Sequence, residues 1–156
     1  MIKKVAIVTG SSKGIGKAIV MGVARSKEYS SISVNARRGE KAQNVSKEIM
    51  DFYSKWCSSL AVDADVSRES DCIRLIHETV DRLGMLDVLV NNAGVQENIP
   101  FIETTVEEWY KIIGVDLTGP FVCSREAVKQ MQKQVNPGGG CIINISSVHQ
   151  HIPKPP

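Results

Sequence analysis

The chain has 156 residues, which is enough for one domain with its own hydrophobic core. Apolar residues make up 42% and charged residues 23%, as in ordinary globular proteins, and the net charge of +2 comes without a basic stripe. We therefore expect no nucleic-acid partner and, because no apolar run could span a bilayer, no membrane partner. Met1 leads directly into strand-like sequence without the apolar region of a signal peptide, so the expected location is cytoplasmic.

Short apolar runs alternate with segments whose apolar residues recur at helical spacing. The patterns predict five strands, at Val5–Val8, Ile32–Ala36, Leu60–Val62, Leu86–Val90 and Cys141–Ile145. Between them they predict four helices: one over 15–27, one at Glu40–Tyr53, one that Ser67 caps and Gly84 ends, and one from Thr105 to about Gln134. Gly119 and Pro120 allow a bend in the last helix. The alternation predicts a single α/β domain over residues 1–156, a Rossmann-like doubly wound parallel sheet that stops after the fifth strand.

The cysteines show no pattern of a disulfide or metal site. Cys57, Cys72, Cys123 and Cys141 are far apart and form no C-x-x-C pair. Cys123 lies in a helical pattern and Cys141 begins an apolar run, so we expect both to be small buried side chains. We expect no bound metal.

The first apolar run ends in a glycine-rich turn, Thr9-Gly10-Ser11-Ser12-Lys13-Gly14-Ile15-Gly16, that opens the first helix. Unpaired backbone N–H groups at a helix N-terminus favour a phosphate. Gly10 would permit the tight turn, Gly14 would let the backbone approach a pyrophosphate, and Gly16 would let the helix pack closely on the strand. The alternative is an ordinary strand-to-helix turn, but the flanking strand and helix favour a dinucleotide site.

Polar residues follow every predicted strand. The stretches are the glycine turn, Asn35-Ala36-Arg37-Arg38, Asp63-Ala64-Asp65-Val66, Asn91-Asn92-Ala93-Gly94 and Ser146-Ser147. Because the carboxyl ends of parallel strands lie along one edge of the sheet, we expect these stretches to form one binding site there.

Two complete motifs make the chain resemble a short-chain dehydrogenase/reductase: T-G-x-x-x-G-I-G at the first turn and N-N-A-G after the fourth strand. The resemblance covers all 156 residues. It implies a nicotinamide cofactor held by the glycine turn, including Ser12, Lys13 and Ile15. It also implies that Asp65 accepts a hydrogen bond from the adenine amino group, with the Val66 backbone beside it. Asn92, Ala93 and Gly94 would shape the adenosine-ribose side.

The end of the second strand indicates which nicotinamide cofactor is preferred. An NAD site usually presents a carboxylate there to hold the ribose 2′-hydroxyl, but this chain has Ala36 followed by Arg37 and Arg38. Lys13 lies in the glycine turn, close to where a 2′-phosphate would sit. Cations there would add charge-assisted hydrogen bonds, so we expect NADP to be preferred over NAD. The alternative is that the two arginines only solvate a loop.

By the same resemblance, Ser147 is the catalytic candidate that hydrogen-bonds the substrate carbonyl or hydroxyl. In similar enzymes a Tyr-x-x-x-Lys pair further along the chain moves the proton, because an unperturbed tyrosine is a poor base near neutral pH. The sequence reaches Pro156 before that pair. Two hypotheses of other classes therefore stay open: a nucleotide-binding fragment without turnover, and an interaction protein that keeps the fold.

A second catalytic candidate is Asp116, in Val115-Asp116-Leu117-Thr118-Gly119. The family normally has asparagine at this position, where it supports a bend in the helix and a water in the proton relay. Aspartate is nearly isosteric with asparagine but charged, so it either substitutes in the relay or impairs it. The alternative is a purely structural helix residue.

Closer similarity to the bacterial glucose 1-dehydrogenases within the family is suggested by Ser124-Arg125-Glu126-Ala127 and by Ser146-Ser147-Val148-His149 with Ile152-Pro153. Glu97 and His149 would then line a sugar pocket. The expected activity is hydride transfer between NADP and an alcohol or carbonyl substrate, with 3-oxoacyl and ketone reductases as alternatives. The family also implies a homodimer or homotetramer formed through the long helix.

Overall fold

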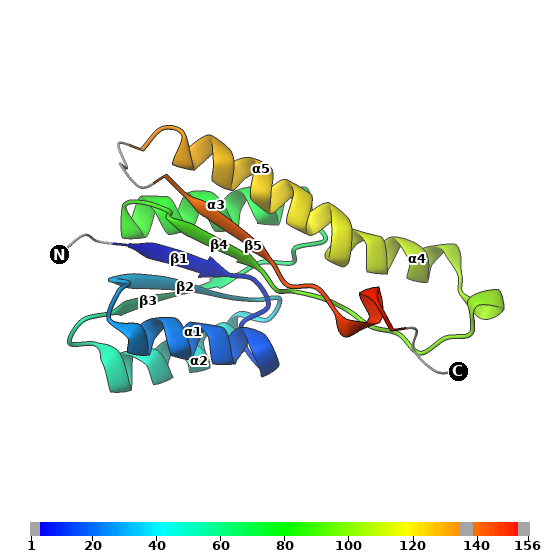
Figure 1. Ribbon diagram of the computed structural model, residues 1–156, viewed down its shortest axis with the longest axis horizontal. Coiled ribbons are helices and arrows are strands. Elements are labelled where there is room, and N and C mark those ends of the chain that lie inside the picture. Colours follow the sequence, from blue (N-terminus) through cyan, green and yellow to red (C-terminus); the bar gives the residue numbers. More distant parts are fainter. Residues whose placement is uncertain (1–3, 135–138, 153–156) are drawn as a thin grey trace.

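The computed structural model describes residues 4–134 and 139–152 and places five parallel strands in one sheet (Figure 1). The strands are β1 (Val5–Val8), β2 (Ser31–Ala36), β3 (Ser58–Asp63), β4 (Val88–Asn91) and β5 (Cys141–Asn144). Their order across the sheet is β3-β2-β1-β4-β5, and every neighbouring pair is parallel. The predicted Rossmann-like α/β fold is confirmed for the part of the chain that the structure describes.

Helices cover both faces of the sheet. They are α1 (Gly14–Ser26), α2 (Gly39–Tyr53), α3 (Glu69–Leu83), α4 (Val106–Ile113) and α5 (Gly119–Met131), with short helical turns η1 (Phe101–Glu103) and η3 (Val148–Gln150) and a π-helical segment, η2 (Gly114–Thr118). α1 and α2 lie on one face, and α3 and α5 lie on the other (Figure 1). Among the described residues, none of these helices has the length and apolar content needed to cross a bilayer.

Most predicted elements lie within two residues of their expected bounds, and the differences follow from hydrogen bonding. Leu86 was predicted to begin the fourth strand, which instead begins at Val88. The Leu86 N–H donates to Gln134 Oε1 at 2.7 Å, and Gln134 Nε2 donates to the Leu86 carbonyl at 2.9 Å. The side-chain amide of Gln134 therefore takes the place of a strand neighbour at Leu86.

The prediction that Ser67 caps α3 is wrong. The N-cap is Arg68, and no side chain caps the helix. The Ser67 hydroxyl and N–H both donate to Asp65 Oδ1, at 2.7 and 3.1 Å, so the serine closes a turn on the preceding aspartate. The predicted end at Gly84 is confirmed: its φ is 90°, and its N–H donates to the Val80 carbonyl at 2.7 Å.

The long final helix is interrupted near Pro120, as predicted, but by a π-helical segment rather than a simple bend. Pro120 has no N–H to donate to the preceding turn, and the Gly119 N–H instead donates to the Gly114 carbonyl, five residues back. At the start of α4, Thr105 and Glu108 form a reciprocal capping box. The chain from 106 to 131 is therefore one rod with a widened turn at η2, which contains Asp116.

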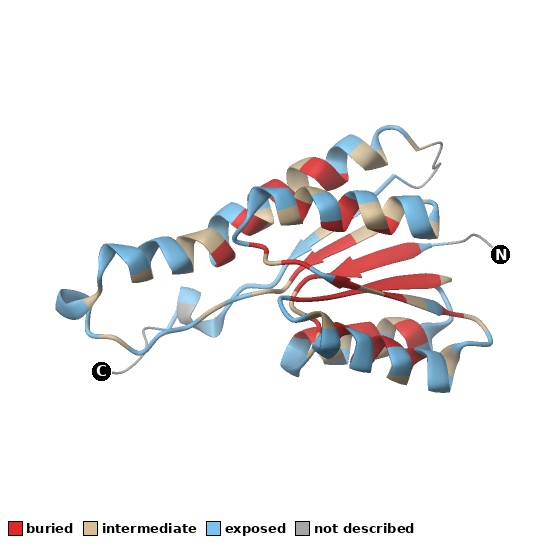
Figure 2. Cartoon of the chain, turned by 180° about the vertical axis from the view of Figure 1, so that it is seen from behind, coloured by how far each residue is buried: buried red, intermediate tan, exposed pale blue. Residues whose placement is uncertain are grey.

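The buried residues form two clusters, one on each face of the sheet (Figure 2). β1 is buried along its whole length, because strands and helices surround it on all sides. β5 is an edge strand with one neighbour, and most of its residues are exposed. The expectation that Cys141 is buried is therefore wrong, whereas Cys57, Cys72 and Cys123 are buried.

The packing of α2 gives a stability prediction with a control on the same helix. Ile49 is fully buried against the sheet, whereas the side chain of Phe52 is 68% exposed. Ile49→Ala removes buried methyl groups and leaves a cavity, so it is expected to lower the free energy of unfolding by about 2–5 kcal/mol. Phe52→Ala is expected to change it by less than about 1 kcal/mol. Urea denaturation of both variants measures the difference, and equal losses would contradict the assigned face of α2.

Candidate functional site

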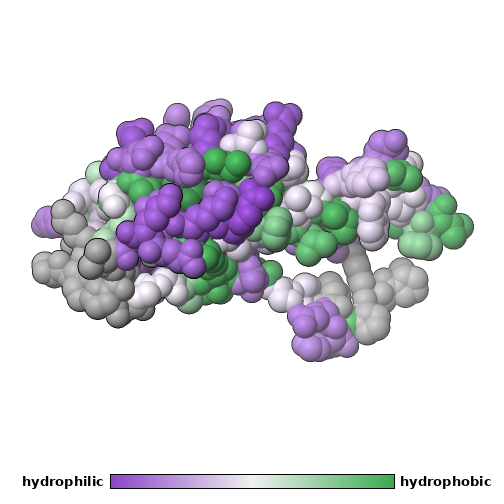
Figure 3. Space-filling view, turned by 90° about the horizontal axis from the view of Figure 1, so that it is seen from above, coloured by the Kyte–Doolittle hydropathy of each residue, from purple (hydrophilic) through white to green (hydrophobic). Residues whose placement is uncertain are grey.

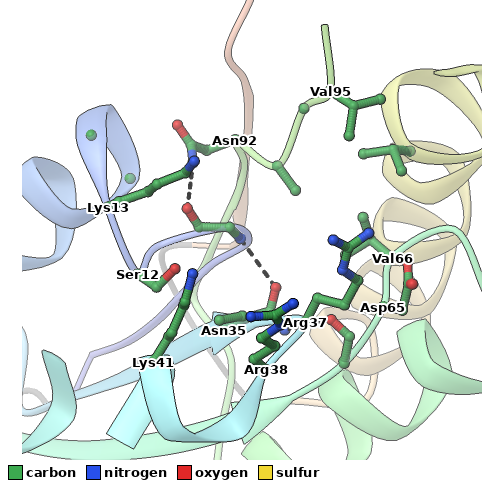
Figure 4. Close-up of a pocket in the computed structure, with 18 of the residues that line it drawn as sticks. Ser12, Lys13, Asn35, Arg37, Arg38, Lys41, Asp65, Val66, Asn92 and Val95 are labelled. Carbon is green, nitrogen blue, oxygen red and sulfur yellow. Dashed lines mark hydrogen bonds between the residues drawn. The ribbon is translucent and has the colours of Figure 1, made fainter. Parts of the chain in front are cut away.

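A cavity of about 600 Å³ opens at the carboxyl ends of the strands (Figure 4). Its lining comes from the turn after β1, from the ends of β2, β3 and β4, from Lys41 in α2 and from Val115 in η2. Every residue predicted from the sequence to bind the cofactor lines this cavity. These residues are Gly10, Ser12, Lys13, Gly14, Ile15, Gly16, Arg37, Arg38, Asp65, Val66, Asn92, Ala93 and Gly94. Stretches far apart in the sequence therefore share one surface, as the parallel topology requires.

The turn after β1 presents a helix N-terminus to the cavity. Gly14 is the first residue of α1, has a φ of 55°, and would point an added Cβ into open space. The first turn of α1 contains no acidic residue, and no side chain caps its N-terminus. Its N–H groups are therefore directed at the cavity without an internal anion, which suits a phosphate.

Side-chain amides fix the position of this turn. The Gly10 N–H donates to Asn35 Oδ1 at 3.1 Å, and Asn92 Nδ2 donates to the Thr9 and Gly10 carbonyls at 2.9 and 3.2 Å (Figure 4). An added Cβ at Gly16 would lie 2.4 Å from Asn92 Nδ2, so only glycine allows α1 to approach this closely.

Asn35 belongs to one of the stretches predicted to form the binding site, but the sequence reasoning assigned it no role of its own. Its Nδ2 donates to the carbonyls of Val62 and Ala64, at 3.2 and 3.1 Å, and so ties the end of β3 to the β1 turn. The available signal was the amide side chain of Asn35 within the predicted strand, because a buried amide must find hydrogen-bond partners.

Basic side chains surround one part of the cavity. Lys13, Arg37, Arg38 and Lys41 all line it, and Asp65 is the one acidic residue among the described lining residues. Lys41 was not predicted. Its side chain lies at the cavity (Figure 4), and in the first turn of α2 its N–H donates to the Arg38 carbonyl at 3.0 Å. A basic residue one helical turn after the arginine pair was the signal for it.

Asp65 is held as an ionised acceptor. Burial raises the pKa of its carboxyl, but hydrogen bonds from the Ser67 hydroxyl and N–H, together with the positive charges of Arg37 and Arg68, lower it further than burial raises it. The pKa therefore lies below its ordinary value. A neighbouring carboxylate, that of Asp71, accepts the Asp65 N–H at 2.9 Å and orients this turn.

A second cavity of about 1030 Å³ adjoins the first and shares Ile15, Asn92, Ala93, Gly94 and Val95 with it. Ser147 and Asp116, the two predicted catalytic residues, both line this second cavity. The neighbouring Ser146 hydroxyl donates to Gln150 Oε1 at 2.5 Å, whereas Ser147 lies exposed just beyond the end of β5. The structure thus places the candidate serine next to, and not within, the cavity with the basic residues.

Asp116 connects the π-helical segment to the end of β4. Its Oδ1 accepts a hydrogen bond from the Val95 N–H at 2.9 Å. Val95 belongs to the wall shared by the two cavities. Asp116 therefore positions that wall, and its role in a proton relay stays a prediction.

The two residues predicted for a sugar pocket are placed differently. Glu97 forms an ion pair with Lys111 and is not among the described residues that line either cavity. The backbone of His149 lies in η3, but its side chain lies outside the described part of the chain. Their substrate roles stay predictions. Within residues 4–134 and 139–152, no group of three histidine, cysteine or acidic residues is arranged as a metal site.

Comparison with known proteins agrees with this geometry. A sequence profile for the family described as short chain dehydrogenase matches residues 4–155. The chain is 40% identical over 154 residues to Glucose 1-dehydrogenase 2 of Bacillus subtilis (strain 168), covering 97% of this chain and 57% of that protein. It is 38% identical over 152 residues to the uncharacterized oxidoreductase YohF of Escherichia coli (strain K12), covering 97% of this chain and 58% of that protein.

Among solved structures, a gluconate 5-dehydrogenase from Burkholderia cenocepacia J2315, in complex with NADP and tartrate, superposes with a TM-score of 0.83 at 30% identity. The match covers 97% of this chain and 56% of that one. The chain therefore spans somewhat more than half the length of the proteins it resembles.

Proposed function

The chain belongs to the short-chain dehydrogenase family, and we propose that it binds NADP in its first cavity and supports hydride transfer between NADP and an alcohol or carbonyl compound in the second. The observation that carries this proposal is the junction of the two cavities: one combines a helix N-terminus with a group of basic side chains, and the other contains Ser147. The chain covers 56–58% of the length of the relatives from which this activity is inferred, so the activity is proposed from the family and not from the chain alone.

The residues of the first cavity fit the pyrophosphate and adenosine parts of a dinucleotide. The N-terminus of α1, open beside Gly14, suits the pyrophosphate, and the ionised carboxyl of Asp65 suits a donor such as the adenine amino group. When bound, a nicotinamide cofactor supplies the carbon that accepts or donates the hydride, while the protein binds and orients it.

NADP is proposed over NAD because of the charges at the end of β2. Ala36 lines the cavity where a carboxylate would hold the 2′-hydroxyl of NAD, and Arg37, Arg38 and Lys41 follow it. These cations can approach a 2′-phosphate without first breaking a strong internal ion pair, since no salt bridge is formed by the three within the described residues. The NADP-bound gluconate 5-dehydrogenase structure supports the same cofactor.

For the substrate, we propose a polyhydroxylated compound such as a sugar or sugar acid. The support comes from the two similar proteins whose names state a glucose and a gluconate activity. In the second cavity, the Ser147 hydroxyl would donate to the substrate oxygen, and Ser124 and Asn144 add further polar groups to the lining. A 3-oxoacyl or ketone substrate is the alternative within the family.

We also propose that the protein self-associates through the side of the rod formed by α4, η2 and α5. Large apolar side chains outside both cavities are exposed there, including Val106, Trp109, Tyr110 and Val128, with exposed fractions of 41–68%. Figure 3 shows apolar side chains gathered at the projecting end of the molecule that holds η1 and α4. Exposed apolar patches of this kind mark interaction surfaces.

The cofactor preference is tested by Arg37→Asp, with Arg25→Asp on the exposed end of α1 as a control of equal charge change. Isothermal titration of the parent chain should give tighter binding of NADP than of NAD. Arg37→Asp is expected to weaken NADP binding by about tenfold or more, because a charge-assisted contact is replaced by repulsion, and to improve NAD binding. Equal affinities for the two cofactors in the parent chain would contradict the proposal.

The reaction is tested by the turnover of Ser147→Ala with NADP. Loss of the hydroxyl that polarises the substrate oxygen should lower kcat about 10²–10³-fold with glucose or gluconate as substrate. NADP binding, measured separately by titration, should stay unchanged, because Ser147 does not line the first cavity. Turnover near the parent rate would remove Ser147 from the reaction, and binding without turnover in the parent protein would favour a nucleotide-binding role alone.

Self-association is tested by sedimentation velocity of Trp109→Asp. A carboxylate in the middle of the exposed apolar face should shift the protein toward monomer. Phe52→Asp, at an exposed aromatic residue on α2, should leave the sedimentation coefficient unchanged. A parent protein that sediments as a monomer would rule this interface out.

A further inference from the structure

The two adjoining cavities differ in charge. Among the described residues, four basic side chains and one carboxylate, that of Asp65, line the first cavity. In the second, Asp116 is the one ionisable side chain among the described residues that line it. The composite site is therefore basic where a dinucleotide carries its phosphates and acidic where, under the proposed function, the nicotinamide ring would lie.

The carboxylate of Asp116 is held in place at the junction between the cavities. Its Oδ1 accepts the Val95 N–H at 2.9 Å, and a Cβ added at Gly94 would lie 3.6 Å from the same oxygen. Val95 lies across the first cavity from Lys41 and Arg38 (Figure 4). No salt bridge joins Asp116 to a basic residue within the described part of the chain, so its charge is not neutralised there.

The oxidised and reduced forms of NADP differ mainly at the end that would reach this carboxylate. The oxidised nicotinamide ring carries a positive charge, the reduced ring is neutral, and the phosphate groups of the two forms are the same. A fixed carboxylate attracts the charged ring and not the neutral one. We propose that Asp116 selects the oxidation state of the cofactor, strengthening the binding of NADP⁺ relative to NADPH. This inference rests on the proposed NADP site.

The effect has a bounded size, because Asp116 is exposed to solvent. Exposed ion pairs contribute little, so the expected preference due to this carboxylate is about two- to fivefold in the ratio of the two dissociation constants. An asparagine at this position would keep the oxygen that accepts the Val95 N–H and lose only the charge. The substitution therefore separates the electrostatic role from the positioning role.

The experiment is isothermal titration of the purified chain and of Asp116→Asn with NADP⁺ and with NADPH. Asp116→Asn should weaken NADP⁺ binding about two- to fivefold and leave NADPH binding unchanged. Glu107→Gln removes a carboxylate from the exposed side of α4, outside both cavities, and should change neither constant. Comparing two forms of one cofactor cancels the contribution of the basic residues, which under the proposed function would hold the phosphates of both forms equally.

Salt provides a second measurement, made on the parent chain. At about 1 M salt the Debye length falls to about 3 Å, and the attraction between Asp116 and the charged ring is screened. The dissociation constant of NADPH divided by that of NADP⁺ should therefore fall in the parent chain toward the value found for Asp116→Asn. An equal loss of affinity for both forms in Asp116→Asn, or a salt-independent ratio in the parent, would overturn the inference and leave Asp116 a positioning residue. Failure of the parent to bind either form would instead overturn the proposed NADP site.

Discussion

The hydrogen bonds that hold the turn after β1 determine the geometry of everything around it. Past the last ladder pair of each strand, backbone groups lose their partners in the neighbouring strand, and leaving them buried and unpaired would cost about 1–3 kcal/mol each. Asn35 and Asn92 supply partners from β2 and from the end of β4, on either side of β1. The same bonds bring Gly16 and the N-terminus of α1 against Asn92. Two amide side chains thus align the helix N-terminus with the cavity.

The sequence predicted the sheet and the first cavity well, because both depend on short-range patterns. Apolar runs identify strands that are buried on both faces, and a glycine turn after such a run identifies the helix N-terminus. The role of Asn35 was missed because it depends on which strands are neighbours, whereas Lys41 was missed although it follows the arginine pair by one helical turn. Asn35 acts through the end of β3 and the β1 turn, and strand order is not visible in a pattern of residues.

The errors have a similar origin. Ser67 has the residue type and spacing of an N-cap, but a carboxylate two residues earlier competes for its hydroxyl and N–H, and that contact forms instead. Cys141 lies in an apolar run, yet β5 has only one strand neighbour and remains exposed. In both cases the local sequence favours the predicted state, the N-cap at Ser67 and the burial of Cys141. The surroundings in the fold, the Asp65 carboxylate and the open edge of the sheet, favour the state that is observed instead.

The position of Asp116 shows how a local backbone irregularity can place a charge at the centre of the site. The sheet order changes direction between β1 and β4, and in such sheets ligands bind outside the strand ends at this point. Both walls of that crevice are fixed by side chains from neighbouring segments, Asn92 on the β1 side and Asp116 on the α5 side. A regular α-helix would continue with its usual spacing past Gly119, but Pro120 removes one donor and the turn widens. The widened turn contains Asp116, whose side chain accepts a hydrogen bond from the backbone that follows β4. Pro120 therefore both interrupts the helix and determines the position of Asp116, the only ionisable side chain among the described residues that line the second cavity.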